Sequence, residues 1–369
     1  MHERQNWPQF RWRHKEIVGP LAAVRHQQGR LIGRMESLGF ELREAAIVGT
    51  LTREVVTTNE IEGEHLDEES VRSSIARRLG MEVAGLREPN MRVEGVVGLM
   101  LDATGNYRHA LTSERILGWQ ASLFPTGWSG MRRIRVGSWR DDAGGPMQVV
   151  SGPIGRERVH FEAPRADRLD SEVQVFLDWF NASTRTDEVL KAALAHLWFV
   201  TLHPLDDGNG RVARALADML LARSEGTSQR FYSMSAQILR ERAAYYKILE
   251  RTQKGTLDVT VWMQWFLRCL DRAIDGSRET LGLVLEKSRF WDSIRDVSLN
   301  ARQRKMLNRL LDGFEGKLTT SKWAKICKSS QDTALRDISE LLKLGILARS
   351  EAGGRSTSYT LAGATSRTT

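Results

Sequence analysis

The amino-acid sequence predicts a mainly α-helical protein with an inserted β-hairpin and a small α+β winged helix at its C-terminal end. Apolar residues recur at helical spacing through most of the 369 residues, a length that allows a large buried core. Within the helical part, short β-branched runs bounded by glycine and proline turns occur at Met131 to Pro164. After Ala301 the order helix, turn, helix, strand, turn, strand is typical of a winged helix.

The first part of the chain, residues 1–105, is predicted to be a helical region. Apolar residues follow a helical period between Arg30 and Gly63, and Gly63 stands where a helix would end on a glycine. Two further helices are predicted at Ser70 to Leu79 and Arg92 to Ala103.

The main helical domain is predicted at residues 106–275. Its expected helices are Leu111 to Leu123, Leu169 to Asn181, Asp187 to Leu202, Arg211 to Arg223, Glu241 to Gln253 and Val259 to Ala273. The hairpin region interrupts them, with strands expected at Ile134 to Val136, Gln148 to Val150 and Arg158 to Phe161. A helical connector, 276–300, and the small domain, 301–362, complete the predicted organisation.

Charge and cysteine content limit the class of protein. The net charge is +8, and residues 301–369 alone have 13 Lys and Arg against 6 Asp and Glu, so almost all of the excess lies there. Cys269 and Cys327 are far apart and outside any CxxC spacing, which argues against a disulfide framework or a zinc site and indicates a reducing compartment. No secretion signal occurs in Met1 to Pro20, and about eighteen apolar residues never run together. We therefore expect a cytoplasmic protein without a membrane span.

One segment, His203 to Arg214 (HPLDDGNGRVAR), has the composition of an anion site. It lies between two predicted helices, so the turn Gly208-Asn209-Gly210 opens onto a helix N-terminus, where N–H groups are unpaired and the dipole favours negative charge. The glycines allow the backbone to approach a phosphate closely. Arg211 and Arg214 are three residues apart on one helix face, and two guanidinium groups suit a polyphosphate.

The same segment contains two residues suited to phosphoryl chemistry. Asp207 is next to the predicted phosphate cradle, where a carboxylate usually holds Mg²⁺. His203 can act as a general base near neutral pH for a hydroxyl that attacks phosphorus. The alternative is an ordinary loop with turn glycines, solvated arginines and a packing histidine. All these residue types in this order within one segment favour the site.

The segment resembles the motif of the Fic (fido) family, which is histidine-proline-phenylalanine-x-acid-glycine-asparagine-glycine-arginine-x-x-arginine. Leu205 stands where the family has phenylalanine and is expected to anchor the loop in the core. The resemblance implies a protein adenylyltransferase that moves AMP from ATP to a Ser, Thr or Tyr hydroxyl. His203 would then deprotonate the hydroxyl, Asp207 would bind Mg²⁺, and Arg214 would contact the γ-phosphate.

The resemblance also implies that Asn209, Arg211 and the amides of Gly208 and Gly210 hold the phosphates. Glycine at both positions, rather than the alanine and lysine of the kinase-like branch, favours AMP transfer over phosphate transfer.

In the same family a β-hairpin called the flap holds the target protein by strand addition, and Met147 to Phe161 fits this role. An ordinary surface hairpin is the alternative, with His160 as a structural residue. Aromatic residues after the motif are expected to line the adenine pocket, for which Tyr245 and Tyr246 are candidates. Core packing is the competing interpretation of both tyrosines.

A second segment, Thr58-Asn-Glu-Ile-Glu62-Gly63, resembles the inhibitory motif of Fic proteins. Thr58 and Glu62 are four residues apart, so the hydroxyl can orient the carboxylate. The resemblance implies that Glu62 pairs with Arg214 and displaces the γ-phosphate of ATP. An acidic helix end capped by glycine is the alternative. With Trp7 to Trp12 and the stretch after Glu62, the resemblance extends over most of Trp7 to Ala273.

The basic C-terminal domain leaves other functions open. Its second helix would carry Arg336 and Lys343, and the turn Gly353-Gly354-Arg355 would be a wing that reaches phosphates. A winged helix also mediates protein contacts, so DNA is one of two partner classes. The alternatives to AMP transfer are a DNA-binding regulator whose core senses nucleotide or modifies itself, and an enzyme that removes AMP. A homodimer also stays open.

Overall fold

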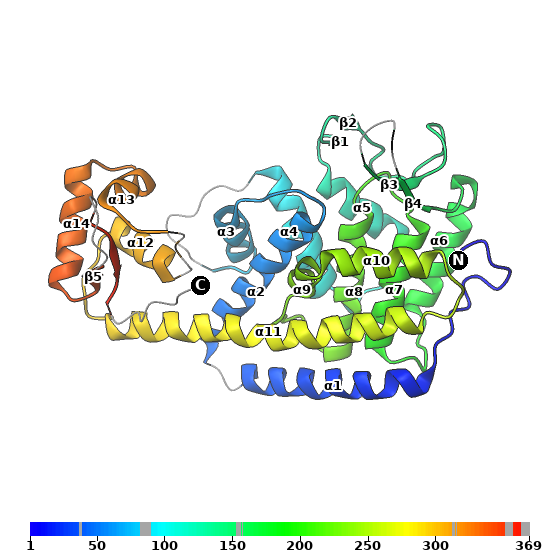
Figure 1. Cartoon of the computed structure of the whole chain (residues 1–369), viewed down its shortest axis with the longest axis horizontal. Helices are drawn as coiled ribbons and strands as arrows, with labels where there is room; N and C mark the ends of the chain where they lie inside the picture. Colours follow the sequence, from blue (N-terminus) through cyan, green and yellow to red (C-terminus); the bar gives the residue numbers. More distant parts are fainter. Residues whose placement is uncertain are drawn as a thin grey trace. The chain divides into compact units, whose positions relative to one another are not determined.

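Helix α7 (Glu188–Leu202) and helix α8 (Asn209–Glu225) form the buried centre of the first structural unit (Figure 1). Almost every residue of α7 is buried, and α8 is buried from Arg211 to Ala222. A helix that is apolar all round belongs in a core. The loop between these two helices is His203 to Gly208, so the predicted functional segment joins the two most buried elements of the molecule.

The computed structural model describes residues 1–36, 39–81, 90–152, 156, 158–311, 314, 316–350 and 357–362, and the chain divides into two units, Met1–Thr280 and Leu281–Thr369. The other helices and strands of the first unit are α1 (His14–Glu36), α2 (Phe40–Ile61), α3 (Glu68–Arg78), α4 (Met91–Gly105), α5 (Ser113–Leu123), β1 (Trp128–Ser129), β2 (Arg132–Arg133), β3 (Gln148–Ser151), β4 (Arg158–Glu162), the 3-10 helix η1 (Ala166–Arg168), α6 (Leu169–Asn181), α9 (Met234–Arg240) and α10 (Arg242–Gln253). Helix α11 (Thr260–Ser293) begins in this unit.

Short polar residues fix where several of these helices begin. Asp67, Asn90, Thr112 and Asp187 each accept a backbone N–H from the first turn of α3, α4, α5 and α7. Helix α4 meets α5 at Gly95, where a Cβ atom would collide with the backbone carbonyl of Ser122. This glycine therefore allows the two helices to approach closely.

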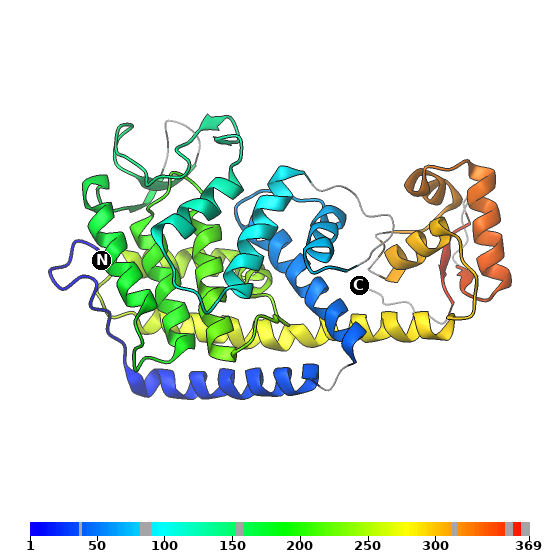
Figure 2. The ribbon, with the colours of Figure 1, turned by 180° about the vertical axis from the view of Figure 1, so that it is seen from behind.

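The N-terminal segment packs along the central helices. Trp7 and Phe10 contact the buried Trp198 of α7 edge to face, with ring centroids 6.0 and 5.5 Å apart. Helix α1 then lies beside the first part of α11, as Figures 1 and 2 both show, and Gln264 donates a hydrogen bond to Glu16 across this contact at 3.0 Å.

The β structure of the first unit consists of two antiparallel hairpins, β1 with β2 and β3 with β4. The strand expected at Ile134 to Val136 is wrong. These residues follow β2 without forming a strand. The Ile134 N–H donates to the Gly127 carbonyl at 3.0 Å, while the Arg135 N–H donates to the Asp206 side chain at 2.8 Å and the Arg135 carbonyl accepts from Gln120 at 2.9 Å. Strands β3 and β4 match the two other strand predictions to within one residue.

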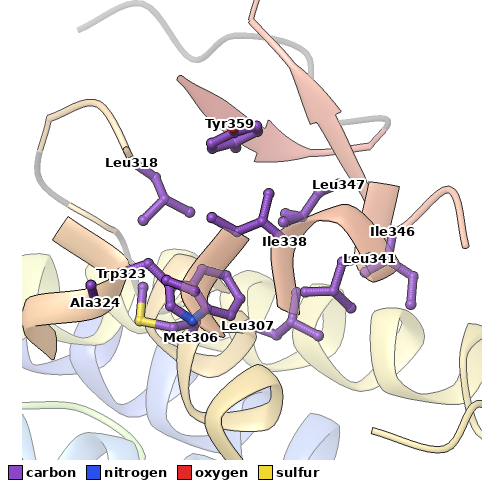
Figure 3. Close-up of a cluster of buried hydrophobic side chains, with 11 residues drawn as sticks. Met306, Leu307, Leu318, Trp323, Ala324, Ile338, Leu341, Ile346, Leu347 and Tyr359 are labelled. Carbon is purple, nitrogen blue, oxygen red and sulfur yellow. The ribbon is translucent and has the colours of Figure 1, made fainter. Parts of the chain in front are cut away.

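The second unit contains the C-terminal part of α11, then α12 (Ala301–Leu311), α13 (Thr320–Cys327), α14 (Gln331–Lys343) and the antiparallel strands β5 (Leu347–Arg349) and β6 (Tyr359–Leu361). Figure 3 shows its small core, in which Trp323 of α13 and Ile338 of α14 lie among aliphatic side chains. The helices and strands after Thr319 follow the predicted order. The expected wing, Gly353-Gly354-Arg355, lies outside the described residues.

The mainly α class predicted from the sequence is confirmed. Helix boundaries differ in two informative places. Helix α8 begins at Asn209 rather than Arg211, and α11 continues without a break to Ser293, so it includes most of the residues 276–300 that were expected to form a separate connector. Helices α1, α9 and α12 were not predicted as separate elements. Among the described residues no helix is long and apolar enough to cross a membrane.

Candidate active site

The loop between α7 and α8 is held in one conformation by side chains that sequence analysis did not single out. His203 ends α7 in the left-handed region, with φ at 48°. Arg140 then fixes the turn, since its Nε donates to the His203 carbonyl at 2.8 Å and its N–H to the Pro204 carbonyl at 2.9 Å. A lone arginine far from the motif gives no sequence signal for this role.

Asn209 fastens the other end of the loop. Its Oδ1 accepts the Leu205 N–H at 3.0 Å and its Nδ2 donates to the Leu205 carbonyl at 2.7 Å, and the residue is buried. Its side chain is therefore used inside the protein, and only its backbone N–H at the start of α8 can face an anion. The expected contact of Asn209 with phosphate therefore stays a prediction, made through its backbone N–H. Leu205 is fully buried, as expected for the position where the family has phenylalanine.

A side chain at either motif glycine would lie too close to neighbouring atoms. Gly208 has φ at 91°, and a Cβ atom there would lie 3.2 Å from the side chains of Leu123 and Phe124. A Cβ atom on Gly210 would overlap the Glu62 carboxylate and lie 3.2 Å from Nη1 of Arg214. Glu62 therefore occupies the N-terminus of α8, where an anion is favoured.

Arg214 donates hydrogen bonds to residues at the C-terminal end of α2. Its Nη2 donates to Glu62 Oε1 at 2.6 Å and to the Thr58 carbonyl at 2.9 Å, and its Nε donates to the Thr58 hydroxyl at 2.7 Å. Burial opposes the charged guanidinium, but the Glu62 carboxylate raises the pKa of Arg214 above its usual value. The Thr58 hydroxyl binds the arginine directly, which differs from the expectation that it orients the carboxylate.

Arg211 is buried beside Arg214 and has a different partner. Its Nη1 donates to Glu64 Oε2 at 2.9 Å and to Asn59 Oδ1 at 3.3 Å, while its guanidinium carbon lies 4.9 Å from the ring centre of Phe124. Sequence analysis missed Glu64, although it lies two residues after Glu62. The acid-glycine-acid pattern across Gly63 was the available signal.

The environment of His203 favours a neutral imidazole. Burial lowers its pKa below the ordinary value, so the imidazole is neutral near pH 7. Nδ1 lies 3.3 Å from the Val200 carbonyl, which assigns the ring proton to Nδ1 and leaves the Nε2 lone pair free.

Asp207 lies at the open side of the loop, with its side chain 40% exposed. One carboxylate oxygen accepts the Gly208 N–H at 2.5 Å and the other accepts the Ser129 hydroxyl of β1. Among the described residues no three potential protein ligands gather around a metal position. One carboxylate with substrate phosphates and water is the ligand set that Mg²⁺ accepts, so Asp207 fits that ion.

The two candidate adenine residues have different environments. Tyr245 is buried, its hydroxyl pairs with His196 Nε2 at 2.9 Å, and burial raises its pKa. It has no exposed ring face to offer a base, so the geometry favours core packing for it. Tyr246 is 40% exposed and donates to the Ile61 carbonyl at 3.3 Å, next to Glu62. Its role at the adenine stays a prediction.

The candidate flap is the β3 and β4 hairpin within Met147 to Phe161, of which residues 153–155 and 157 lie outside the described part of the chain. Val150 and Val159 are exposed on it. His160 joins the hairpin to α10, because its Nδ1 lies 2.8 Å from Glu250 Oε2. Lys254 and His160 lower the pKa of Glu250 to about 2, so this carboxylate is ionised at neutral pH.

Comparison with known proteins shows two families to which parts of the sequence are similar. Residues 110–221 match the Fic/DOC family, and residues 1–81 match a domain of unknown function, DUF4172. The chain therefore contains a Fic/DOC-family domain, which extends from the end of α4 almost to the end of α8.

Two curated relatives are proteins named protein adenylyltransferase Fic. The one from Nematostella vectensis is 31% identical over 119 residues, 31% of this chain and 25% of the relative. The one from Drosophila willistoni is 32% identical over 132 residues, 34% of this chain and 25% of the relative. The chain spans about a quarter of the length of these relatives.

The fold is also similar to that of a Fic family protein from Desulfovibrio desulfuricans. The two structures superpose with a TM-score of 0.53 at 20% sequence identity, over 95% of this chain and 97% of the other. This similarity confirms the Fic-type helical fold that the sequence predicted.

Proposed function

We propose that the chain transfers AMP from ATP to a hydroxyl of a protein. The observation that supports this most directly is the convergence at the N-terminus of α8 of two buried arginines, Arg211 and Arg214, with a half-buried His203 whose lowered pKa keeps it neutral in the same loop. Two guanidinium groups and unpaired amides suit a polyphosphate, and the neutral imidazole suits proton abstraction. The names of the two relatives support the same reaction.

In this reaction the target hydroxyl oxygen attacks the α-phosphorus of ATP. His203 Nε2 takes the hydroxyl proton, a new P–O bond forms, and the bond to the β-phosphate oxygen breaks so that pyrophosphate leaves with the electron pair. Arg211 and the α8 amides hold the phosphates in line. Mg²⁺ held by Asp207 would neutralise phosphate charge when bound.

Glu62 is the inhibitory residue in this proposal. Its carboxylate lies against Gly210 and pairs with Arg214, so it has both the place and the charge that a γ-phosphate would need. ATP bound beside Glu62 would have a displaced tail, and its α-phosphorus would not be in line with the hydroxyl. Removal of AMP from a modified protein, with Glu62 positioning water, uses the same residues and is the alternative direction.

The test of the activity is transfer of α-phosphate label from Mg-ATP to protein. Glu62→Gly should label itself or a lysate protein strongly, and Glu62→Gly with His203→Ala should not. Loss of label from an AMP-modified protein only when Glu62 is present would favour the reverse direction. Failure of Glu62→Gly to label any protein at saturating Mg-ATP would refute AMP transfer.

We propose as a second function that the C-terminal unit is a winged helix that binds duplex DNA. Its exposed charged side chains support this. The exposed basic residues are Arg304, Lys305, Arg309, Lys317, Lys322, Lys325, Lys328, Arg336, Lys343 and Arg349. The exposed acids among the described residues of 301–362 are Asp332 and Glu340. Such an excess attracts phosphates.

The test of DNA binding uses the full chain and random duplex DNA. Arg336→Ala with Lys343→Ala should weaken binding and reduce its salt dependence, while Lys247→Ala in the first unit should leave both unchanged. Equal affinity in all three proteins would exclude this surface and favour a protein partner.

A further inference from the structure

The segment Thr58 to Glu64 accepts hydrogen bonds from both Arg211 and Arg214, but from different edges of the two guanidinium groups. A guanidinium presents two parallel N–H groups on the edge formed by Nε and Nη2, and this edge matches a phosphate or carboxylate in a bidentate pair. Which edge is occupied decides whether an arginine is blocked or merely held.

For Arg214 the bidentate edge is taken. Thr58 accepts from Nε at 2.7 Å, and Glu62 accepts from Nη2 at 2.6 Å. The atom left over is Nη1, which is buried and has no hydrogen-bond partner among the described residues.

For Arg211 the bidentate edge makes no hydrogen bond within the described residues. Glu64 and Asn59 both accept from Nη1, at 2.9 and 3.3 Å. Nε is buried and has no partner within the described residues, and the Asp207 carboxylate is 3.8 Å from Nη2, beyond hydrogen-bond distance. A buried, unpaired guanidinium N–H costs free energy unless a ligand satisfies it.

Glu64 is itself held on its other oxygen. Arg92 of α4 donates to Oε1 at 2.8 Å, and the Glu64 side chain is 19% exposed. The carboxylate therefore bridges α4 and α8. Two arginines share one carboxylate, so Glu64 orients Arg211 without cancelling the positive charge of the pair.

We propose that Glu64 is a positioning residue that holds Nη1 of Arg211, so that Nε and Nη2 meet the phosphates of ATP. This inference rests on the proposed function. Glu62 and Glu64, two residues apart, then have opposite effects, because one blocks Arg214 and the other prepares Arg211. Without Glu64 the buried guanidinium would keep only Asn59 and could turn on the Phe124 ring.

The experiment uses the full chain with Glu62→Gly and measures the affinity for α,β-methylene ATP with Mg²⁺, together with the KM for ATP in AMP transfer. Glu64→Ala should weaken both about tenfold, the value of one hydrogen bond between charged groups. Glu64→Gln keeps an acceptor for Nη1 and should recover part of the affinity. Glu60→Ala is the matched control, since Glu60 is an acid at the end of α2, four residues before Glu64, and it faces His65 at 3.6 Å instead of an arginine.

A double-mutant cycle shows whether the effect passes through Arg211. In an Arg211→Ala background, Glu64→Ala should no longer change nucleotide affinity. A loss that persists there, a Glu64→Ala variant that behaves like Glu60→Ala, or one that raises transfer as Glu62→Gly does would each overturn the proposal. If Glu62→Gly transfers no AMP, the proposed activity fails, and the nucleotide affinities still test the position of Arg211.

Discussion

The loop from His203 to Gly208 is held by buried side chains, whereas the hairpin of β3 and β4 is held by partly exposed ones. Asn209 and Arg140 bind the loop backbone from positions that are at most 3% exposed. The hairpin reaches α10 through His160 and Glu250, whose side chains are 25% and 22% exposed. Buried hydrogen bonds fix one geometry, whereas a partly exposed polar contact of low strength permits several. The difference suits a loop that aligns reacting atoms and a hairpin that accepts a protein segment.

The largest effect is expected at the base. His203→Ala should lower AMP transfer by about 100- to 10,000-fold, because general base catalysis contributes on that order. ATP affinity should change little, since the imidazole does not bind phosphate in the proposed mechanism. Labelling assays and nucleotide titration in the Glu62→Gly background measure both. Burial lowers the pKa of His203. AMP transfer by the Glu62→Gly protein, in which His203 is intact, should therefore persist below pH 6.5, where an unperturbed histidine would be protonated.

The next effect is relief of the inhibition by Glu62. Glu62→Gly should raise transfer by about 100-fold, the scale of a misalignment of about 1 Å, and should improve ATP affinity less. Arg214→Ala in that variant should remove most of the gain, because the guanidinium that orders the γ-phosphate is gone. An unchanged rate in Glu62→Gly would mean that the pair with Arg214 caps the end of α2 and regulates nothing.

A smaller effect tests the fastening of the loop. Asn209→Ala leaves the buried N–H and carbonyl of Leu205 without partners, which costs about 1–3 kcal/mol of unfolding free energy. Transfer should fall about tenfold as the loop loosens. Asn181 bonds the Leu111 backbone in the same two-fold way at 2.8 Å, far from the site in sequence. Asn181 is exposed, so Asn181→Ala should cost less stability in denaturant titration and leave the KM for ATP unchanged.

The core beneath the loop should respond to acid. Burial lowers the pKa of His196 to about 3, so between pH 6.5 and 3 the unfolded chain binds a proton that the folded chain does not. This contribution to stability is complete above pH 6.5 and is lost as the pH falls, by up to about 1.4 kcal/mol per pH unit. His196→Gln should make the stability less dependent on pH from 6.5 to 4.5. Parallel curves for the two proteins would contradict the assignment.

Sequence analysis recovered what local patterns determine. Helices α7 and α8 followed from apolar periodicity and the stop at Pro204, and the loop between them from its glycines. The Glu62 and Arg214 pair was reached only through family resemblance, because no spacing rule joins residues 152 positions apart.

The features that were missed depend on tertiary contacts. Arg140, Asn59 and Glu64 are ordinary polar residues in sequence, and only the fold brings them to the loop. Asn209 was assigned to phosphate because the motif names it, while its side chain bonds to the Leu205 backbone. Ile134 to Val136 has the composition of a strand, but the Arg135 backbone finds side-chain partners in Gln120 and Asp206, which composition cannot reveal.

The smallest effect is expected at the hairpin. His160→Ala removes the 2.8 Å contact with Glu250 and leaves Arg158, at 3.3 Å, as the remaining partner on the hairpin. A partly exposed pair contributes about 1 kcal/mol, so the KM for a protein target should rise by at most about fivefold while the KM for ATP stays constant. The target for this measurement is a protein that Glu62→Gly labels in lysate.

Gln148→Ala is the control, since Gln148 donates a hydrogen bond to Glu162 within the hairpin at 2.8 Å and its loss leaves the contact with α10 intact. A change in the KM for ATP of similar size would show instead that the hairpin shapes the nucleotide site, and the division of roles between loop and hairpin would have to be abandoned.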